Sequence, residues 1–525
     1  MSPRPGNPLF AIMIAAVIAV SGCEAQETPH SISPQAHYNE CFEAMRDGEI
    51  KLVEMGSEKA REWEAKWQSL SPSTWQDAES ACGKVARSLG QMHDGYLDAK
   101  AVARMKEAVD SHVTGIGAQV AMAGMLKARN EIADRLGDNP SGEQLKRAQE
   151  QMKAVMTLTP ERPLFVVKPL PGSPAEKAGL LAGDIIEAAG SDSEHMQSLY
   201  GRGFEDVVLN MIRGPEGSAI YLTVKRKNEN GAATTLEPIK VIRSKFEVNP
   251  VEYRLVEGMP YVKLTTFMSD LAAHEMEAAL KKAAQEFRSK NGKAGLILDL
   301  RGNTGGQTIQ AEVILSMLIK DGVILETRNR QGNQLEIEEK VLHDHFYEIN
   351  RWTAANPTQM QNSTTMRAND ERAMPALILP REMPMVVLVD EGSASASEIV
   401  AGALKAQRPI TMVVGETTFG KSVGQHVVEL ADGTAIKVTT FEFRPGGVPI
   451  DGVGVTPDVI SRLEEGDFDE AGNLRNDRQL DAAKSALATL IARKEAQENE
   501  AAAAAKRNST RDRKIMQQLE SSLDE

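Results

Sequence analysis

The clearest pattern of apolar and polar positions lies between residues 384 and 425. An apolar run of strand length, residues 384–390, is followed by a turn of small residues and then by a helical pattern. The helical pattern places its apolar side chains on one face: Ile399, Val400, Ala403 and Leu404. A second apolar run, residues 410–414, ends in another glycine-rich loop. This order predicts a βαβ unit with a right-handed crossover, whose two loops lie at the carboxyl ends of parallel strands.

The segment upstream of this unit follows a similar order. Residues 261–267 predict a strand, and residues 271–290 predict a helix. Residues 294–300 form a continuous apolar run, typical of a buried parallel strand, and the sequence RGNTGG follows them. A helix over 311–318 comes next. We therefore expect an α/β core, a mixed sheet with βαβ units, over residues 245–465, which ends in strands near 426–430 and 434–443.

Both flanks of this core are predicted to be helical. Residues 35–112 read as a helical region, with helices near 75–89 and 97–109, and no chemistry is evident there. Such a region is typical of a packing or dimerisation module. Residues 466–525 form a charged tail that is helical from Arg478 onward, solvated or in contact with another copy of the chain.

The two glycine-rich loops of the βαβ unit bring a serine and a lysine together. Ser395 lies in the first loop and Lys421 in the second, which suggests a Ser–Lys hydrolase. Ser393 and Ser397 are alternative nucleophiles. Ser395 and Glu398 also fit the Ser-x-x-Glu pattern of a capping box, which requires no catalysis. Both interpretations can hold together, because a serine that caps a helix lies beside the next N–H group.

These residues also carry a family resemblance. GSASASEIVAGAL followed by GETTFGKSVGQ resembles the active-site region of the carboxyl-terminal processing proteases, the tail-specific serine peptidases. The resemblance implies that Ser395 is the nucleophile, that Lys421 is the base and that Gln425 orients the lysine amine. DLRGNTGG is similar to the glycine loop of the same family. It implies an oxyanion hole formed by the N–H groups of Gly306, with Gly305 close behind, and Ala396.

Lys421 also fits two other patterns. GETTFGKS matches a nucleotide-binding P-loop, which works only if a helix begins at the lysine, whereas the residues that follow favour a loop and a strand. His426 would allow a Ser–His pair, but no acidic partner is marked in the sequence. As a base, Lys421 must be neutral near pH 7, so burial must lower its pKa by about 3 units from ~10.4.

A second resemblance lies upstream of the core. GSPAEKAGL, a short gap and then GD with two isoleucines resemble a PDZ domain of the protease-associated type over residues 113–244. The resemblance implies that Gly115, Ile116, Gly117 and Ala118 bind the terminal carboxylate of a peptide, which then adds as a strand to a sheet edge. Residues 122–161 form an insertion, with helical spacing of Leu145, Ala148, Met152 and Val155, that would cover or lengthen the groove. The alternative for residues 115–120 is an ordinary strand that contains glycine.

The first residues predict export rather than fold. Arg4 precedes a short apolar run, residues 9–20, so residues 1–22 predict a signal peptide. Val-Ser-Gly-Cys resembles the lipobox of bacterial lipoproteins, which implies acylation of Cys23 and a polar tether over 23–34. We expect a lipid-anchored protein of the periplasm or cell envelope; the alternative is a soluble secreted protein. Cys41 and Cys82 form either one disulfide or two buried thiols.

Charge and histidine content change the picture little. The net charge of −14 argues against nucleic acid as a partner. His343-Asp344-His345 lies in a long polar connection, residues 329–380, and invites a metal interpretation, but no third ligand is evident at metal spacing. A solvated helix or loop is favoured there, so we expect no metal and no cofactor.

Together these patterns predict a serine endopeptidase. Its substrates would be proteins or peptides with exposed C-termini, cut near the tail after capture by the PDZ-like domain, and the enzyme would be a homo-oligomer. The alternative is a binding protein: a lipid-anchored PDZ scaffold on a catalytically inactive hydrolase fold. The presence of all three matching side chains, Ser395, Lys421 and Gln425, disfavours the scaffold.

Overall fold

A computed structural model describes residues 32–122, 132, 135, 142–228, 231–343, 346–355, 360, 362–367, 374–467 and 474–523. The predicted signal peptide and Cys23 lie outside the described residues, as does all of the tether but its last three residues. Helix α2 (Pro34–Gly48) begins where the tether was expected to end. In the described part of the chain, no helix has both the length and the apolar character needed to cross a bilayer.

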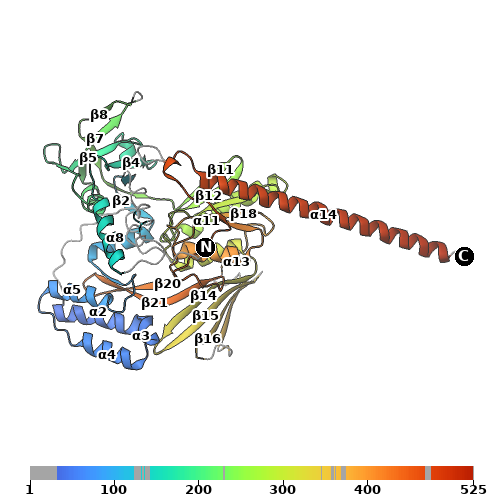
Figure 1. Ribbon diagram of the computed structural model, residues 1–525, viewed down its shortest axis with the longest axis horizontal. Helices are drawn as coiled ribbons and strands as arrows, with labels where there is room; N and C mark the ends of the chain where they lie inside the picture. Colours follow the sequence, from blue (N-terminus) through green and yellow to red (C-terminus); the bar gives the residue numbers. More distant parts are fainter. Residues whose placement is uncertain are drawn as a thin grey trace.

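A six-stranded sheet forms the centre of the molecule (Figure 1). Its order is β11 (Val251–Val256), β12 (Met259–Leu264), β13 (Leu296–Asp299), β18 (Met385–Val389), β19 (Thr411–Gly415) and β22 (Val459–Ile460). All neighbours from β12 to β22 are parallel, and β11 is antiparallel to β12. The predicted unit of strand, helix and parallel strand is therefore confirmed as β18, α13 (Ala396–Gln407) and β19.

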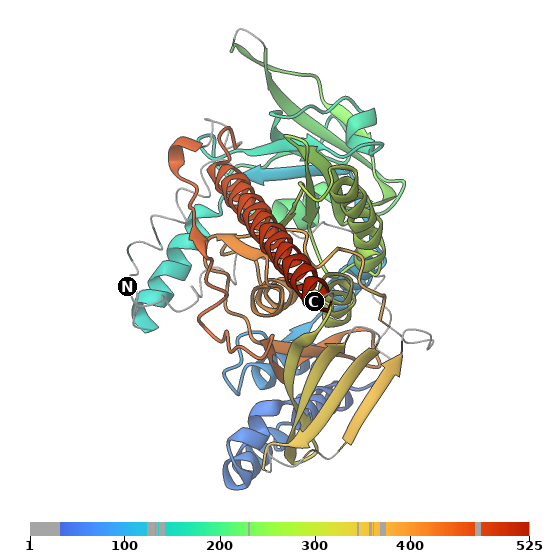
Figure 2. The same cartoon turned by 90° about the vertical axis from the view of Figure 1, so that its right-hand side faces the viewer.

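Helices cover both faces of this sheet. Alternate strand residues, among them Leu298 and Val387, pack in one apolar cluster with α11 (Ala272–Ser289), α12 (Thr308–Leu318) and α13. The intervening residues, among them Ile297 and Val386, face the first turns of α14 (Arg478–Leu523). Period-two alternation explains how continuous apolar strands serve two faces at once. The rest of α14 projects far beyond the body (Figure 1), and Figure 2 shows the same helix foreshortened, crossing the view obliquely.

A second sheet corrects the prediction of a polar connection over residues 329–380. Four antiparallel strands occupy much of it: β14 (Gly322–Gln331), β15 (Gln334–His343), β16 (Phe346–Thr353) and β17 (Asn362–Arg367). They continue a sheet that contains β1 (Gly95–Leu97), β20 (Val423–Glu429) and β21 (Ala435–Pro445). The charges that suggested a loop are instead paired across strands: Arg351 Nε lies 2.8 Å from Glu338 Oε2. Such cross-strand pairs stabilise a polar sheet surface.

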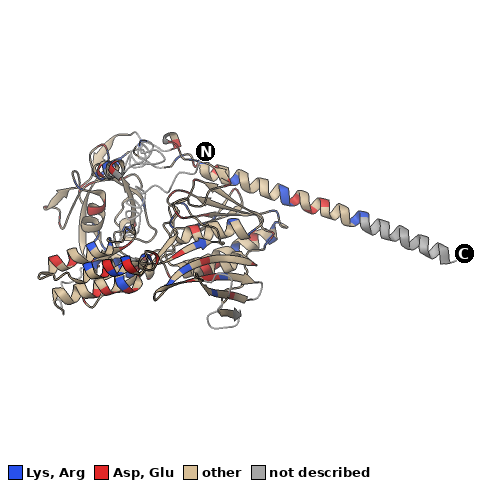
Figure 3. Cartoon of the chain, turned by 60° about the horizontal axis from the view of Figure 1, so that its bottom comes forward, with Lys and Arg blue, Asp and Glu red and all other residues tan. Residues whose placement is uncertain are grey.

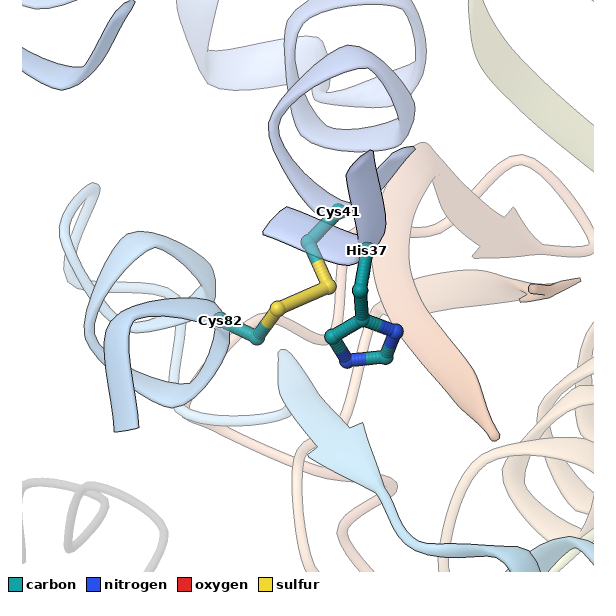
Figure 4. A group of neighbouring side chains, drawn as sticks. All are labelled: His37, Cys41 and Cys82. Carbon is teal, nitrogen blue, oxygen red and sulfur yellow. A yellow bond between two sulfur atoms is a disulfide. The ribbon is translucent and has the colours of Figure 1, made fainter. Parts of the chain in front are cut away.

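The N-terminal helices are confirmed, with one unpredicted strand. They are α2, α3 (Ile50–Glu54), α4 (Ser57–Gln68), α5 (Trp75–Ala86) and α6 (Ala99–Val109). Strand β1 interrupts them and pairs with β21, so this region is joined to the second sheet. Cys41 of α2 and Cys82 of α5 form a disulfide beside the ring of His37 (Figure 4), which decides between the two cysteine alternatives. Charges of both signs line these helices and α14 (Figure 3).

The PDZ-like segment is a third sheet, whose main path is β3 (Ala118–Met122), β4 (Leu164–Pro169), β5 (Ile185–Gly190), β7 (Ala219–Lys227) and β8 (Ala233–Thr235). The remaining elements are β6 (Met196–Ser198), β9 (Ile239–Ile242), α8 (Gly142–Val155), α9 (Pro174–Lys177), α10 (Phe204–Asp206) and the π-helix η1 (Val207–Ile212). The two halves separated by the insertion pair directly, because β3 is antiparallel to β4. The predicted helix in the insertion is α8. The chain enters this domain through β2 (His112–Gly115) and leaves it through β10 (Ser244–Glu247), and these two strands form a separate antiparallel pair.

Candidate active site

Ser395 lies in a strained turn at the start of α13. Its backbone has φ 56° and ψ −115°, a region that non-glycine residues rarely adopt, and its side chain and backbone together are 8% exposed. Its N–H donates to Glu398 Oε2 at 2.8 Å, one half of the predicted capping box. Strain of this kind persists where surrounding contacts hold it, and it clusters at functional sites.

The neighbouring serines differ from Ser395 in their partners. The hydroxyl of Ser393 donates to the Leu300 carbonyl at 2.8 Å, and that of Ser397 donates to the Asn303 carbonyl at 2.7 Å. Both residues are fully buried. A hydroxyl proton held by a buried carbonyl is not available to a base. These two serines connect the serine turn to the residues that follow β13, and Ser395 is the one of the three that keeps some solvent exposure.

Glu398 connects the serine turn to the lysine loop. One oxygen of its buried carboxylate accepts the N–H of Lys421 at 2.9 Å and the N–H of Ser395. The other accepts the N–H of Gly420 and the hydroxyl of Thr418, both at 2.6 Å. Burial raises the pKa of Glu398 to about 7, although these four donors oppose the shift. The capping pattern marked this residue in the sequence, but not its contact with the lysine loop.

Lys421 has the environment that a neutral amine requires. Its Nζ donates to Gln425 Oε1 at 2.9 Å, which joins two of the predicted site residues. Burial lowers the pKa of Lys421 to about 8; the positive charge of Lys437 lowers it further, and Glu398 acts in the opposite direction. The loop therefore gives the amine a much larger neutral fraction near physiological pH than an ordinary lysine has, although the charged form still predominates there.

The two other interpretations of this loop do not fit the structure. Strand β20 begins at Val423, so the helix that a P-loop lysine must start is not there. His426 follows Gln425 on that strand, is exposed, and lines a cavity of about 560 Å³ against helix α2. Adjacent strand residues point to opposite faces of a sheet, so His426 is directed away from the side that Gln425 shares with Lys421.

The glycine loop after β13 lies directly against the serine turn. A methyl group added to Gly305 would come within 2.6 Å of the Ala394 carbonyl oxygen and 2.9 Å of the Ala396 nitrogen. The Gly305 N–H donates to the Asn303 side chain at 3.0 Å and is therefore occupied. The N–H groups of Gly306 and Ala396 donate to no acceptor within the described residues. These N–H groups lie in two different loops, the glycine loop and the serine turn, and free backbone N–H groups are the kind of donor that stabilises a developing negative charge on oxygen.

The predicted carboxylate-binding residues surround a turn between two strands. Gly115 ends β2, Ala118 begins β3, and Gly117 between them has φ 71°. Residues 115–120 are therefore not one continuous strand. Within the described chain, β3 pairs only with β4, which leaves its other edge open for an added strand.

The described residues around positions 343–345 give no support to a metal site. A solvated helix or loop was expected there, but His343 is the last residue of strand β15, and its Nε2 lies 3.0 Å from Glu348 Oε2; Asp344 and His345 are outside the described residues. Elsewhere, His37, Cys41 and Cys82 place potential ligand atoms within 4.8 Å of one another. Because the two sulfur atoms are bonded to each other, they are not metal ligands in this state.

Comparisons with known proteins identify two domains in the chain. Residues 258–461 match the sequence model of peptidase family S41, and residues 165–226 match a PDZ domain. The chain is 28% identical over 369 residues to a carboxy-terminal-processing protease of Bartonella bacilliformis, covering 70% of this chain and 66% of the relative. It is 32% identical over 309 residues to a chloroplastic carboxyl-terminal-processing peptidase 2 of Arabidopsis thaliana, covering 57% and 50%.

A solved structure of a photosystem II D1 C-terminal processing protease is similar with a TM-score of 0.44 and 24% identity, covering 85% of this chain and all of that one. The chain spans between half and about two thirds of the length of the two curated relatives. The domain assignment rests on these matched segments. The chain therefore contains a peptidase domain of family S41 at residues 258–461 and a PDZ domain at residues 165–226.

Proposed function

We propose that this protein is a serine endopeptidase that cleaves near the C-terminal tails of protein substrates, with Ser395 as nucleophile and Lys421 as general base. The observation that carries the proposal is the double contact of Glu398, whose carboxylate holds the N–H groups of both residues. One buried side chain thereby fixes the nucleophile and the base relative to each other. Gln425 accepts a hydrogen bond from the lysine amine itself.

The reaction is acyl transfer in two stages. The neutral amine of Lys421 takes the proton of the Ser395 hydroxyl as the oxygen attacks the peptide carbonyl. The N–H groups of Gly306 and Ala396 stabilise the oxyanion. The lysine then returns the proton to the leaving amine, and the C–N bond breaks. Water, deprotonated by the same amine, releases the acyl group and regenerates the serine.

Recognition of the tail is assigned to the PDZ domain. A peptide would add to the open edge of β3, with its terminal carboxylate at the turn formed by Gly115, Ile116, Gly117 and Ala118. This arrangement explains why a peptidase would prefer chain ends to internal loops. It also predicts that substrate tails are unfolded when they bind.

Anchoring, location and assembly follow from the sequence. We propose that Cys23 is acylated, that the protein resides at the membrane of the cell envelope, and that it acts there as a homo-oligomer. The pattern that supports the anchor is the short apolar run that ends in Val-Ser-Gly-Cys. Mass spectrometry of the mature N-terminus tests the anchor: a lipid on Cys23 supports it, and a free amine beyond that residue contradicts it.

Labelling with a fluorophosphonate tests the catalytic assignment. The purified wild-type chain should react, and mass spectrometry should place the label on Ser395. Ser395→Ala should abolish both labelling and peptide hydrolysis, whereas an exposed serine change such as Ser485→Ala should alter neither. A wild-type chain that binds C-terminal peptides but takes up no label would favour the alternative, a PDZ scaffold on an inactive hydrolase fold.

A further inference from the structure

We infer that Asp94 and Thr439 are positioning residues that orient the side-chain amide of Gln425 and, through it, the amine of Lys421. The inference rests on the proposed Ser–Lys function. Neither residue belongs to the sequence motifs that identified the site. Asp94 comes from the N-terminal helical region, just before strand β1, and Thr439 lies on strand β21. The helical region would thus take part in the chemistry as well as in packing.

Three consecutive hydrogen bonds connect Lys421 to Asp94. Lys421 Nζ donates to Gln425 Oε1 at 2.9 Å, and Gln425 Nε2 lies 3.2 Å from Thr439 Oγ1. Thr439 Oγ1 lies 2.7 Å from Asp94 Oδ1, and the Thr439 N–H donates to the same oxygen at 2.7 Å. Thr439 is fully buried and Asp94 is 6% exposed.

The direction of every bond in this series is set at Asp94. Asp94 Oδ1 accepts the backbone N–H of Thr439, and the hydroxyl of Thr439 donates to the same oxygen, so the one hydroxyl proton of Thr439 points at Asp94. The Thr439 oxygen is then left to accept, and its partner must be the NH₂ group of Gln425. The amide carbonyl of Gln425 is therefore turned toward Lys421. An amide orientation is an inference from its network, and here the network allows only one.

This orientation matters because Lys421 works as a neutral amine. A carbonyl oxygen accepts an N–H of the amine in its charged and its neutral state. The lone pair of the neutral amine is thereby directed away from Gln425 and is free for the Ser395 proton. The reverse amide would present N–H donors to the lysine and hold that lone pair. Gln425 thus acts as the third group of the site, which orients the base beside its nucleophile.

Several titratable groups surround Asp94 and Lys421. Glu49, at the junction of α2 and α3, is buried near Asp94, and burial raises the pKa of Glu49 to about 9. Lys437 of β21 places a positive charge near Asp94, and burial lowers the pKa of Lys437. His93 stays neutral, since burial lowers its pKa to about 3. Glu398 approaches Lys421 from α13.

Paired variants test the role of the two residues. Thr439→Val removes the acceptor for the Gln425 amide, and Asp94→Ala lets the Thr439 hydroxyl turn around. Each should lower kcat for peptide hydrolysis by roughly 10- to 100-fold with little change in KM, as expected of a residue that orients a catalytic group. Thr439→Ser and Asp94→Asn keep the hydroxyl and the accepting oxygen, so both should restore most of the activity.

Two further readouts separate orientation from a structural role. In Thr439→Val, the apparent pKa of kcat/KM should fall, because an amide turned toward Lys421 disfavours the ammonium form, and high pH should not rescue the plateau. In a Gln425→Ala background, Thr439→Val should have no further effect on kcat. Equal losses in both backgrounds, or an unchanged pKa in a folded Thr439→Val variant, would overturn the inference.

Labelling of the wild type keeps the two proposals apart. If wild type takes no fluorophosphonate on Ser395, the Ser–Lys function itself is wrong. If wild type is labelled and folded Thr439→Val and Asp94→Ala react at the same rate, only the positioning role is wrong. Circular dichroism and thermal unfolding establish that each variant is folded. If Asp94→Ala fails to fold, the isosteric variant Thr439→Val and the conservative variant Thr439→Ser still test the positioning role.

Discussion

Ser393, Ser395 and Ser397 alternate along one turn, and only their surroundings separate them. The outer two donate to backbone carbonyls in the core, whereas Ser395 holds a left-handed backbone conformation at the rim of the site. The sequence marked the turn by its small residues, but it did not distinguish the three from one another. Family resemblance did so, and the geometry gives a physical reason to favour the same residue.

Lys421 should titrate in the pH dependence of the reaction. Because only the neutral amine accepts the serine proton, kcat/KM should rise with pH through a pKa of about 8 and then level off. Lys421→Arg retains the charge but cannot deprotonate, so the loss should be at least roughly 10²–10⁴-fold. Peptide hydrolysis by both proteins across pH measures this.

Lys437 provides a matched control for that profile. Its positive charge is the second cause of the low pKa of Lys421, after burial. Lys437→Met should therefore move the rising limb to higher pH while the plateau stays near wild type. A folded, substantially active Lys421→Arg variant would contradict the role of Lys421 as base.

At the scale of elements, a strong periodicity of apolar residues was sufficient to predict a helix or a strand from the sequence. Elements with a weak periodicity were not predicted. The buried strands and α11–α14 follow from apolar runs and helical spacing, and the βαβ order fixed which loops share an edge. Strands β14–β17 were not predicted, because their many charged residues suggested a solvated loop. In the structure, charged residues on neighbouring strands form ion pairs with each other. Strand β1 is three residues long, and its pairing with β21 is a tertiary contact that no local pattern carries.

The same limit explains which site residues were found. Glycine-rich loops carry recognisable sequence motifs, and the residues predicted from the sequence lie in these loops or beside them: Ser395, Lys421 and Gln425. Asp94 and Thr439 act across a separation of 345 residues, and only the folded chain reveals their contact. Glu398 stands between these cases, since its capping pattern is local and its contact with Lys421 is not.

The turn before β3 should discriminate between chain ends. A peptide with a free C-terminal carboxylate should be cleaved with a lower KM than its C-terminal amide, because backbone N–H groups favour the anion. Gly117→Ala should remove this preference, since a methyl group there would lie 2.3 Å from Ser173 Cβ. Gly172→Ala is the matched control: it has a similar φ, 73°, in open space. Equal cleavage of acid and amide by wild type would count against tail recognition.

At the scale of the whole molecule, the N-terminal helices are part of the peptidase rather than an appendage. Helix α2 packs on β21, β1 extends the same sheet, and the Arg330 guanidinium donates to the Glu49 carbonyl at 2.8 Å. Asp94 of this region contacts Thr439 of β21, where the proposed path to Lys421 begins. A change that loosens the helices should therefore reach the active site even though it lies outside the family-matched segment.

The disulfide offers a test of this coupling. It joins Cys41 and Cys82 over 41 residues, and a loop of that length corresponds to about 4 kcal/mol of stabilisation in the chain-entropy model. The variant Cys41→Ala/Cys82→Ala should keep a near-normal kcat at low temperature, where the helices still pack. On heating, it should lose activity at a lower temperature than wild type, before the peptidase core unfolds, because Asp94 leaves Thr439 when the helices detach.

Circular dichroism and peptide hydrolysis, measured in parallel on a temperature ramp, check this sequence of events. Reducing agent should move the wild-type curves toward those of the double variant and should leave the variant unchanged, which separates loss of the bond from loss of the side chains. If activity and core structure disappear at one temperature in the double variant, the helices and the core unfold as a single unit. If activity outlasts the helices, the N-terminal region is dispensable for catalysis, and the path from Asp94 to Lys421 has no catalytic role.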